Sequence, residues 1–256
     1  MRKVLVIGIG AGDPEHLTVQ AVRALATVDV VFAMDKGAAK GELVQLRRAV
    51  CERYITERPY RFLEVADPVR TEAGGSYGAG VKRWHEERAD IYERLIRDEL
   101  GETATGAVLV WGDPSLYDST LRIIDEVRRR GAVAFDHAVI PGISSVQALA
   151  ARHRTVLNRI GAPVHITTGR RLAAEGLPAD VASGATVAVM LDGDTAFRLL
   201  PDQAGLEIVW GAYLGTADEI LIAGRLSEVG DRIRAARAEA QAAKGWIMDI
   251  YLLRKA

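Results

Sequence analysis

The chain has 256 residues, of which 49% are hydrophobic and 26% are charged, and its formal net charge is −1. This length suits two modest α/β domains, and a charge so close to zero gives no general attraction for nucleic acid or an anionic membrane. Cys51 is the single cysteine, which excludes an internal disulfide and a multi-cysteine metal site. Without a leader-like segment or a membrane-length apolar run, we expect a soluble, cytoplasmic protein with no bound metal.

The first motif is an apolar segment, residues 4–7, that runs into a turn containing Gly8, Gly10 and Gly12. The apolar segment predicts a strand buried on both faces, as in a parallel sheet, and the glycines let a ligand approach the backbone. A dinucleotide fingerprint would need glycine at position 13, where the chain has Asp13. Because a carboxylate there disfavours a pyrophosphate, a sulfonium cofactor such as S-adenosylmethionine fits better than NAD. A turn that only connects a strand to a helix is also possible.

Strand and helix patterns alternate through the first half. We expect strands at 29–34, 62–65 and 107–111, with helical patterns between them, the first capped by Thr18. Such alternation indicates a parallel sheet with helices on both faces, whose ligands bind beyond the carboxyl ends of the strands. Gly10 and Asp35, which follow the first two strands, are therefore expected at that edge.

Two further glycine turns follow strands in the same half. GDPSLY (112–117) follows the strand at 107–111, and PGISS (141–145) follows residues 139–140. We expect a helix over 116–127, with Tyr117 one turn into it, its hydroxyl directed at the site or its ring partly buried. Ser144 and Ser145 are placed to cap the next helix. Three strand–glycine–helix junctions are typical of a cofactor cleft.

A loop without periodicity is expected over 67–80, and basic residues flank it. These residues could bind a polyanionic ligand. Alternatively, they form a solvated face balanced by acidic residues of the following helix. The basic residues are Arg58, Arg61, Arg70, Lys82, Arg83 and Arg88.

The second half has fewer helices between its strands, which predicts a mixed or antiparallel sheet. The expected strands are 164–168, 186–191, 207–210, 220–223 and 246–253, with a charged helix over 228–243. We therefore expect two domains, 1–138 with the glycine turn and a substrate trough, and 139–256 with the mixed sheet.

Taken together, the motifs resemble those of the tetrapyrrole methylases, the S-adenosylmethionine-dependent enzymes of corrin and sirohaem synthesis. The matching motifs, in order, are GxGxGDPxxLT (8–18), GDPxxY (112–117) and PGISS (141–145). The resemblance implies an α/β fold of two αβα domains with the cofactor cleft between them, a tetrapyrrole substrate and a homodimer.

Within this family, DKGAAK (35–40), GGSYGAGVKRWHEERADIY (74–92) and GDPSLYDST (112–120) most resemble the branch that methylates C1 of precorrin-5 and releases acetate. Other precorrin methyltransferases share the core motifs and differ in the ring carbon they methylate. A nicotinamide-dependent oxidoreductase and a non-catalytic cofactor-binding protein are the remaining alternatives.

The resemblance also implies roles for individual residues. An aspartate after the second strand is a proton acceptor in related methylases, which makes Asp35 the favoured catalytic base. Tyr117 is the second residue expected to be catalytic. By their positions near the sheet edge or the loop, Asp118, His85 and Glu86 are further candidates for the base. The carboxylates of the substrate would bind Arg61, Arg70, Lys82 and Arg83. The residues expected to contact the cofactor are Gly10, Ala11, Gly12, Trp111, Gly112, Asp113, Leu116, Tyr117, Ser144, Ser145, Met190 and Ala212.

Overall fold

A computed structural model of the chain describes residues 1–35, 37, 41–69, 77–201 and 203–256. The chain divides into two compact units, Met1–Ser144 and Ser145–Ala256. The boundary expected after residue 138 falls inside strand β5 (Phe135–Ile140), which pairs with strand β1 (Arg2–Gly8) and therefore belongs to unit 1. Each unit is described by itself.

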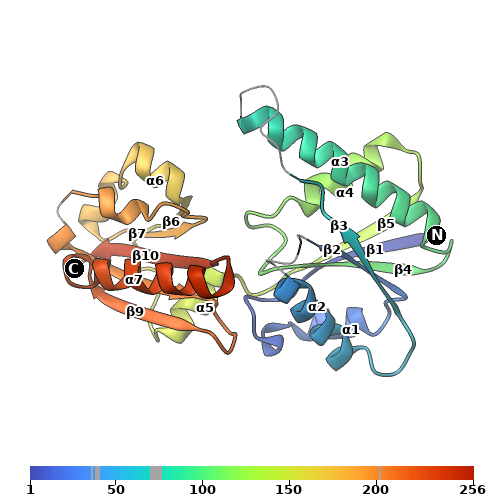
Figure 1. Cartoon of the computed structure of the whole chain (residues 1–256), viewed down its shortest axis with the longest axis horizontal. Coiled ribbons are helices and arrows are strands. Elements are labelled where there is room, and N and C mark those ends of the chain that lie inside the picture. Colours follow the sequence, from blue (N-terminus) through green and yellow to red (C-terminus); the bar gives the residue numbers. More distant parts are fainter. Residues whose placement is uncertain (36, 38–40, 70–76, 202) are drawn as a thin grey trace. The chain divides into compact units, whose positions relative to one another are not determined.

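Unit 1 contains a five-stranded parallel sheet, as the alternating pattern predicts (Figure 1). The strand order is β3-β2-β4-β1-β5. Besides β1 and β5, its strands are β2 (Val30–Asp35), β3 (Arg61–Ala66) and β4 (Thr105–Val110). Its helices are the short η1 (Pro14–His16), α1 (Val19–Leu25), α2 (Gly41–Tyr54), α3 (Tyr77–Asp98) and α4 (Thr120–Arg130).

Both faces of this sheet are apolar because helices cover both. In β1, Val4 and Val6 pack with residues of α3 and α4, whereas Leu5 and Ile7 pack with residues of α1 and α2. Figure 1 shows α3 and α4 on one face of the sheet and α1 and α2 on the other. This arrangement explains why β1, β2 and β4 contain continuous apolar runs and not alternating ones. Helix α1 has the expected cap, since Thr18 Oγ1 accepts a 3.0 Å hydrogen bond from the Ala21 N–H.

Unit 2 contains a mixed sheet, also as predicted, with the order β6-β7-β10-β8-β9. β6 and β7 are parallel, and the other neighbouring pairs are antiparallel. The strands are β6 (Val164–Thr168), β7 (Thr186–Met190), β8 (Leu206–Ala212), β9 (Ile220–Arg225) and β10 (Asp249–Lys255). Its helices are α5 (Ser145–Arg152), α6 (Gly169–Glu175), η4 (Ala179–Ser183), η5 (Ala196–Leu199), η6 (Gln203–Gly205) and α7 (Leu226–Lys244).

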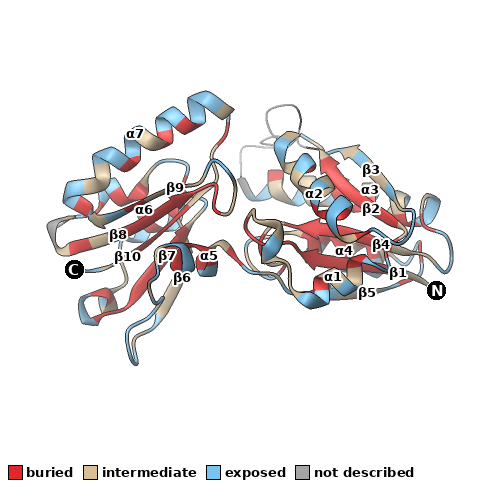
Figure 2. Cartoon of the chain, turned by 90° about the horizontal axis from the view of Figure 1, so that it is seen from below, coloured by how far each residue is buried: buried red, intermediate tan, exposed pale blue. Residues whose placement is uncertain are grey.

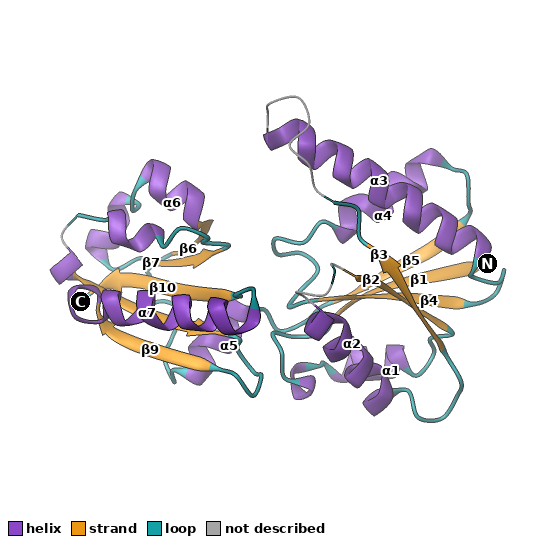
Figure 3. Ribbon diagram, viewed as in Figure 1, coloured by secondary structure: helices purple, strands orange, loops and turns teal. Residues whose placement is uncertain are grey.

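Helices α7 and α5 lie on opposite faces of this second sheet, as Figures 2 and 3 show. The strands between them are largely buried, and exposed residues of α7 face away from the sheet (Figure 2). The α/β class expected from the sequence, with one parallel and one mixed sheet, is confirmed.

Some boundaries differ from those expected. The last strand begins at Asp249 and not at 246, because Tyr213 Oη donates a 2.6 Å hydrogen bond to the Trp246 carbonyl and the two rings pack edge to face. α3 begins at Tyr77, inside the segment expected to be a loop, and α4 begins at Thr120 and not at 116. Among the described residues, no helix is long and apolar enough to span a membrane.

Candidate functional site

The three glycine turns predicted from the sequence lie against one another at the carboxyl edge of the unit 1 sheet. A Cβ atom on Gly8 would lie 2.6 Å from Gly142 N and 2.8 Å from Gly112 O. A Cβ atom on Gly142 would lie 2.1 Å from Gly112 O. Because all these neighbours are backbone atoms, no side chain fits at Gly8 or Gly142 without moving a turn. The glycines therefore hold the ends of β1, β4 and β5 together.

Gly10 and Gly112 connect the first two turns by a pair of hydrogen bonds. The Gly112 N–H donates to Gly10 O at 2.8 Å, and the Gly10 N–H donates to Gly112 O at 3.3 Å. Both glycines have a left-handed backbone, with φ of +80° at Gly10 and +67° at Gly112, which favours glycine at each. Ala11, which follows Gly10, is buried, and Gly12 is partly buried.

Asp113 joins the second turn to the third. Its carboxylate accepts hydrogen bonds from the Gly142 N–H (2.9 Å) and from the N–H (2.8 Å) and hydroxyl (2.5 Å) of Ser115. Partial burial acts to raise the pKa of this carboxyl, but the three hydrogen bonds outweigh it and lower the pKa below the ordinary value. Asp113 is thus an anion that fixes the turns. Trp111 and Leu116 flank this turn and are partly buried, and Ser144, after the third turn, is buried.

Asp13 has a local structural role in the first turn. Its carboxylate accepts a 2.8 Å hydrogen bond from the Glu15 N–H and caps the short helix η1. His16, at the end of that helix, packs against Gly10, where an added Cβ would lie 2.4 Å from His16 Cβ. Its Nδ1 atom is buried and has no hydrogen-bond partner in the described part of the chain. The first turn therefore combines a closely packed backbone with an unsatisfied polar atom beside it.

Asp35 is the last residue of β2, at the same edge of the sheet. Its Oδ1 atom accepts a 2.9 Å hydrogen bond from the Gly37 N–H, and the residue is partly exposed. Side chains alternate along β2, with Met34 packed on the face covered by α3 and α4. Asp35 therefore projects on the face covered by α1 and α2.

Tyr117 does not lie one turn into a helix, as the pattern had predicted. It lies in the loop before α4, 45% exposed, with a left-handed φ of +51°. A positive φ is strained for a bulky residue, and such strain clusters at functional sites. The strand ends at Val110, and the loop that contains Asp113 and Pro114 continues to Ser119 before the helix begins.

In unit 2, Met190 and Ala212 are the last residues of β7 and β8, and they lie on either side of the start of β10. Ile250 is paired with Met190, and Asp249 is paired with Ala212. Leu191, directly after Met190, is 66% exposed and has a φ of +53°. The strand expected over 186–191 ends one residue earlier, at Met190, so Leu191 lies just beyond it.

Asp192 fixes the backbone after Leu191. Its Oδ2 atom accepts hydrogen bonds from Tyr251 Oη (2.6 Å) and from the Ala196 N–H (2.8 Å). The Arg237 guanidinium donates to the Asp192 carbonyl at 2.7 Å. An added Cβ on Gly169 would lie 2.3 Å from Asp192 Oδ1, so glycine is required beside it. Met190 and Leu191 are thus held by a buried polar network.

The basic residues expected to bind substrate do not lie together. Arg61 is the first residue of β3, at the amino edge of the sheet opposite the glycine turns, and it pairs with Glu99. Arg61 is near the loop in sequence, but β3 separates the two, so Arg61 and the loop lie at opposite edges of the sheet. Lys82 and Arg83 lie on exposed turns of α3, with Glu86 and Glu87 as their ion-pair partners. Arg70 lies outside the described residues.

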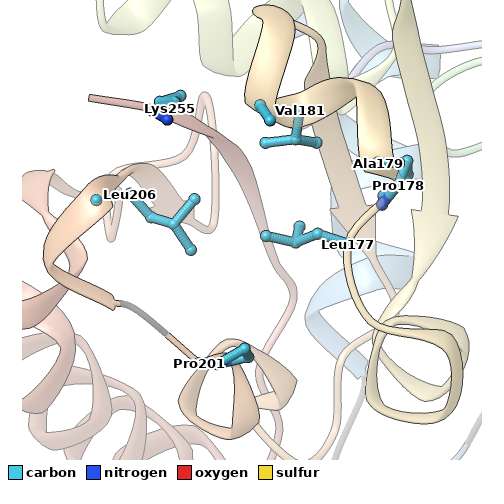
Figure 4. Close-up of a pocket in the computed structure, with 9 residues that line it drawn as sticks. Leu177, Pro178, Ala179, Val181, Pro201, Leu206 and Lys255 are labelled. Carbon is cyan, nitrogen blue, oxygen red and sulfur yellow. The ribbon is translucent and has the colours of Figure 1, made fainter.

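Unit 2 contains an apolar pocket of about 220 Å³ (Figure 4). Lys255, at the end of β10, contributes to its lining. Because β10 is antiparallel to β7 and β8, this end of β10 is at the opposite edge from Met190 and Ala212. Its other lining residues are Leu177, Pro178, Ala179, Val181, Ala182, Pro201, Gly205 and Leu206.

A parallel sheet with three interlocked glycine turns, followed by a mixed sheet, defines the class of protein. The family model for Tetrapyrrole (Corrin/Porphyrin) Methylases matches residues 3–230, and the chain belongs to this family. The resemblance inferred from the motifs is therefore confirmed.

Among its relatives, the chain is 57% identical over 255 residues to precorrin-6A synthase [deacetylating] from Sinorhizobium sp, covering 100% of this chain and 96% of that protein. Among solved structures, it is similar to a cobalamin-synthesis-related protein (CobF) from Corynebacterium diphtheriae, with a TM-score of 0.84, 39% identity, and coverage of 100% of this chain and 99% of the other. The fold alone is shared with uroporphyrin-III C-methyltransferase from Thermus thermophilus in complex with S-adenosyl homocysteine, with a TM-score of 0.58, 21% identity, and coverage of 98% and 92%.

Proposed function

We propose that the chain is an S-adenosylmethionine-dependent C-methyltransferase of aerobic cobalamin biosynthesis, which methylates C1 of precorrin-5 and releases acetate to give precorrin-6A. The observation that carries this proposal is the full-length 57% identity to a deacetylating precorrin-6A synthase. The interlocked glycine turns at the carboxyl edge of the sheet support it, because that edge is where such folds bind ligands.

The residues of the turns fit a sulfonium cofactor. Gly10 and Gly112 present backbone without side chains, and the ionised Asp113 carboxylate is compatible with a nearby cation. The anions at Asp13 and Asp113 disfavour the pyrophosphate of a nicotinamide cofactor, which is the reason to rank an oxidoreductase below a methyltransferase. Trp111, Leu116 and Ser144 would complete the contacts in unit 1. The resemblance also implies cofactor contacts by Ser145, Met190 and Ala212.

When bound, the cofactor supplies a methyl group on an already activated leaving group. The protein therefore contributes mainly by holding the two reactants in line and excluding water, effects that can supply about 7–11 kcal/mol. The rigid turns are suited to this task, because close backbone contacts and hydrogen bonds fix Gly8, Gly112, Asp113 and Gly142 relative to one another. The strained Tyr117 would position the macrocycle.

Release of acetate also requires a group that activates water, because water must attack a carbonyl carbon. A general base at the carboxyl edge of the sheet would accept the proton of that water. Asp35 is placed for this role at the end of β2, with Oδ1 held by the Gly37 N–H. Its Oδ2 atom has no hydrogen bond to any residue that the structure describes, so it is available to water.

Lys82 and Arg83 would bind carboxylates of the tetrapyrrole. Their ion pairs with Glu86 and Glu87 are exposed and each is worth only a few tenths of a kcal/mol, about 0.3–0.5. A substrate carboxylate can therefore replace the glutamates at little cost. A homodimer, which the resemblance implies, stays a prediction.

The test is a panel of substrates. Purified protein with methyl-labelled S-adenosylmethionine is incubated separately with precorrin-2, precorrin-4 and precorrin-5, and label in the macrocycle is measured. We expect label with precorrin-5 alone. Label only with another precorrin would assign the chain to a different methyltransferase of the family, and cofactor binding without label on any substrate would indicate a non-catalytic protein.

A further inference from the structure

The sheet of unit 1 opens between β2 and β4 at its carboxyl edge. The two strands pair from Val30 to Phe32 on β2, and β2 then continues to Asp35 without β4 as its partner. The Val110 carbonyl accepts a hydrogen bond from the Ile9 N–H, on the β1 side. Because successive carbonyls of a strand point in opposite directions, the Leu109 carbonyl points toward β2, into the opening.

The side chain of Arg47, which belongs to α2, reaches the end of β4 at this opening. Its Nε atom donates to the Leu109 carbonyl at 2.9 Å, and its Nη1 atom donates to the Leu43 carbonyl at 2.8 Å. These two bonds fix the guanidinium at the end of β4 and leave its Nη2 atom without a hydrogen bond to a described residue. No carboxylate of the described residues forms an ion pair with it.

The surroundings make Arg47 unusual among the arginines of unit 1. Burial lowers the pKa of its guanidinium and the neighbouring Arg88 cation acts with it, while Tyr92 and Asp118 act in the opposite direction. A partly buried cation without a bonded anion costs free energy, which indicates a purpose other than stability. Asp35 ends β2 at the same edge of the sheet, so a carboxylate and a fixed cation both lie at that edge.

These charges indicate what kind of ligand group the opening accepts. With Asp118 near the guanidinium and Asp35 at the same edge of the sheet, a permanently charged substrate carboxylate would meet like charges there. A neutral carbonyl that gains negative charge only during reaction would avoid much of this repulsion and would benefit from the Arg47 cation.

We infer that Arg47 is a catalytic residue for acetate release, donating from its guanidinium to the oxygen of the acetyl group as that oxygen becomes negative. The inference rests on the proposed function. The oxygen of water bonds to the acetyl carbonyl carbon, one water proton passes to Asp35, and the carbonyl π electrons move to the oxygen beside Arg47. The carbonyl then re-forms, the bond from its carbon to C1 breaks, and acetic acid leaves. The electron pair of that bond enters the conjugated macrocycle and is available at C1 to accept the methyl group.

The experiment compares Arg47→Gln and Arg47→Lys with wild type and with a matched control, Arg48→Gln. Arg48 is the next residue of the same helix, but it pairs with Glu64 and stacks on Phe62 at the surface. For each protein, acetate release is followed in a single turnover with precorrin-5, and the Kd of precorrin-5, the Kd of S-adenosylmethionine and the Tm are measured.

We expect Arg47→Gln to release acetate about 10²–10³-fold more slowly, as for loss of one oxyanion donor, with the Kd of both ligands unchanged. The Arg48→Gln control should match wild type. If the Gln variant fails to fold, the Lys variant is the test, and it should show slowed release with an unchanged Kd for precorrin-5.

Two results would overturn the inference. Acetate release at the wild-type rate in a folded Arg47 variant would remove the residue from the chemistry. A raised Kd for precorrin-5 with normal release at saturation would make Arg47 a ground-state anchor for a substrate carboxylate. If wild type itself transferred methyl without releasing acetate, the proposed function would fail and this inference with it, which separates the two failures.

Discussion

The Asp113 carboxylate and the Gly142 N–H are joined by a 2.9 Å hydrogen bond that connects the turn after β4 to the turn after β5. These two residues belong to separate motifs, GDPSLY and PGISS. Together with the close packing of Gly142 against the Gly112 backbone, this bond fixes the two turns relative to each other. The spacing of the motifs in the sequence therefore reflects a direct contact in the fold.

Replacement of Asp113 by Asn should lower the free energy of unfolding in a pH-dependent way. The hydrogen bonds lower the folded pKa of this carboxyl below its ordinary value of 3.8. Its stabilisation is therefore fully present above that value and is lost as the pH falls through the lower folded pKa. We expect a loss of about 1 kcal/mol at neutral pH, since the group is partly exposed. Urea unfolding of both proteins at neutral pH and at about pH 3 should show the difference shrinking at acid pH; a difference that grows there would refute it.

Gly142→Ala should displace the third turn. The new Cβ would lie 2.1 Å from the Gly112 carbonyl oxygen, a backbone atom with no side-chain freedom. We expect a loss of stability of about 3 kcal/mol and weaker binding of S-adenosylmethionine, measured by thermal unfolding and calorimetry. Gly41→Ala is the matched control, because its added Cβ would lie within 4 Å of no described residue beyond its chain neighbours and the backbone of its own helix. Equal effects of the two substitutions would show that the contact between the turns is unimportant.

Asp35→Asn should slow turnover without changing the binding of S-adenosylmethionine. Asn keeps an oxygen that accepts from the Gly37 N–H but does not take a proton from water. We therefore expect unchanged affinity for S-adenosylmethionine and acetate release slowed by about 10²–10⁴-fold, measured in a single turnover. Normal turnover in this variant would remove Asp35 from the mechanism.

Arg88 and Asp67 form a buried ion pair that connects α3 to the end of β3. Their atoms lie 2.7 Å and 3.1 Å apart in two hydrogen bonds, and each side chain is less than a tenth exposed, at 8% and 6%. Arg88→Met alone should lower stability by about 3–5 kcal/mol, because it leaves Asp67 buried and unpaired. The double variant Arg88→Met with Asp67→Leu should recover part of that loss. Additive losses in urea unfolding would contradict a coupled pair.

Sequence patterns predicted the local features well. The strand at residues 4–7, the cap at Thr18 and the parallel and mixed sheets depend on apolar runs and on short-range signals, and all are observed. The contact of the three glycine turns with one another was implicit in their shared position after parallel strands.

Other features depend on tertiary structure that no local pattern records. Arg61 is close to the loop in sequence, but it begins β3 and so lies at the opposite edge of the sheet. The positive φ of Tyr117 cannot be seen in the residue type. Arg47 and Arg48 are adjacent and chemically identical, and only the opening between β2 and β4 distinguishes the one that is inserted into the sheet.

The most direct measurement is the ratio of acetate released to methyl groups transferred. The purified protein is given precorrin-5 and methyl-labelled S-adenosylmethionine, and label in the macrocycle and free acetate are measured together over time. A deacetylating C1 methyltransferase predicts one acetate released for each methyl transferred. Methyl transfer without acetate would contradict that assignment and place the chain in another branch of the tetrapyrrole methylases.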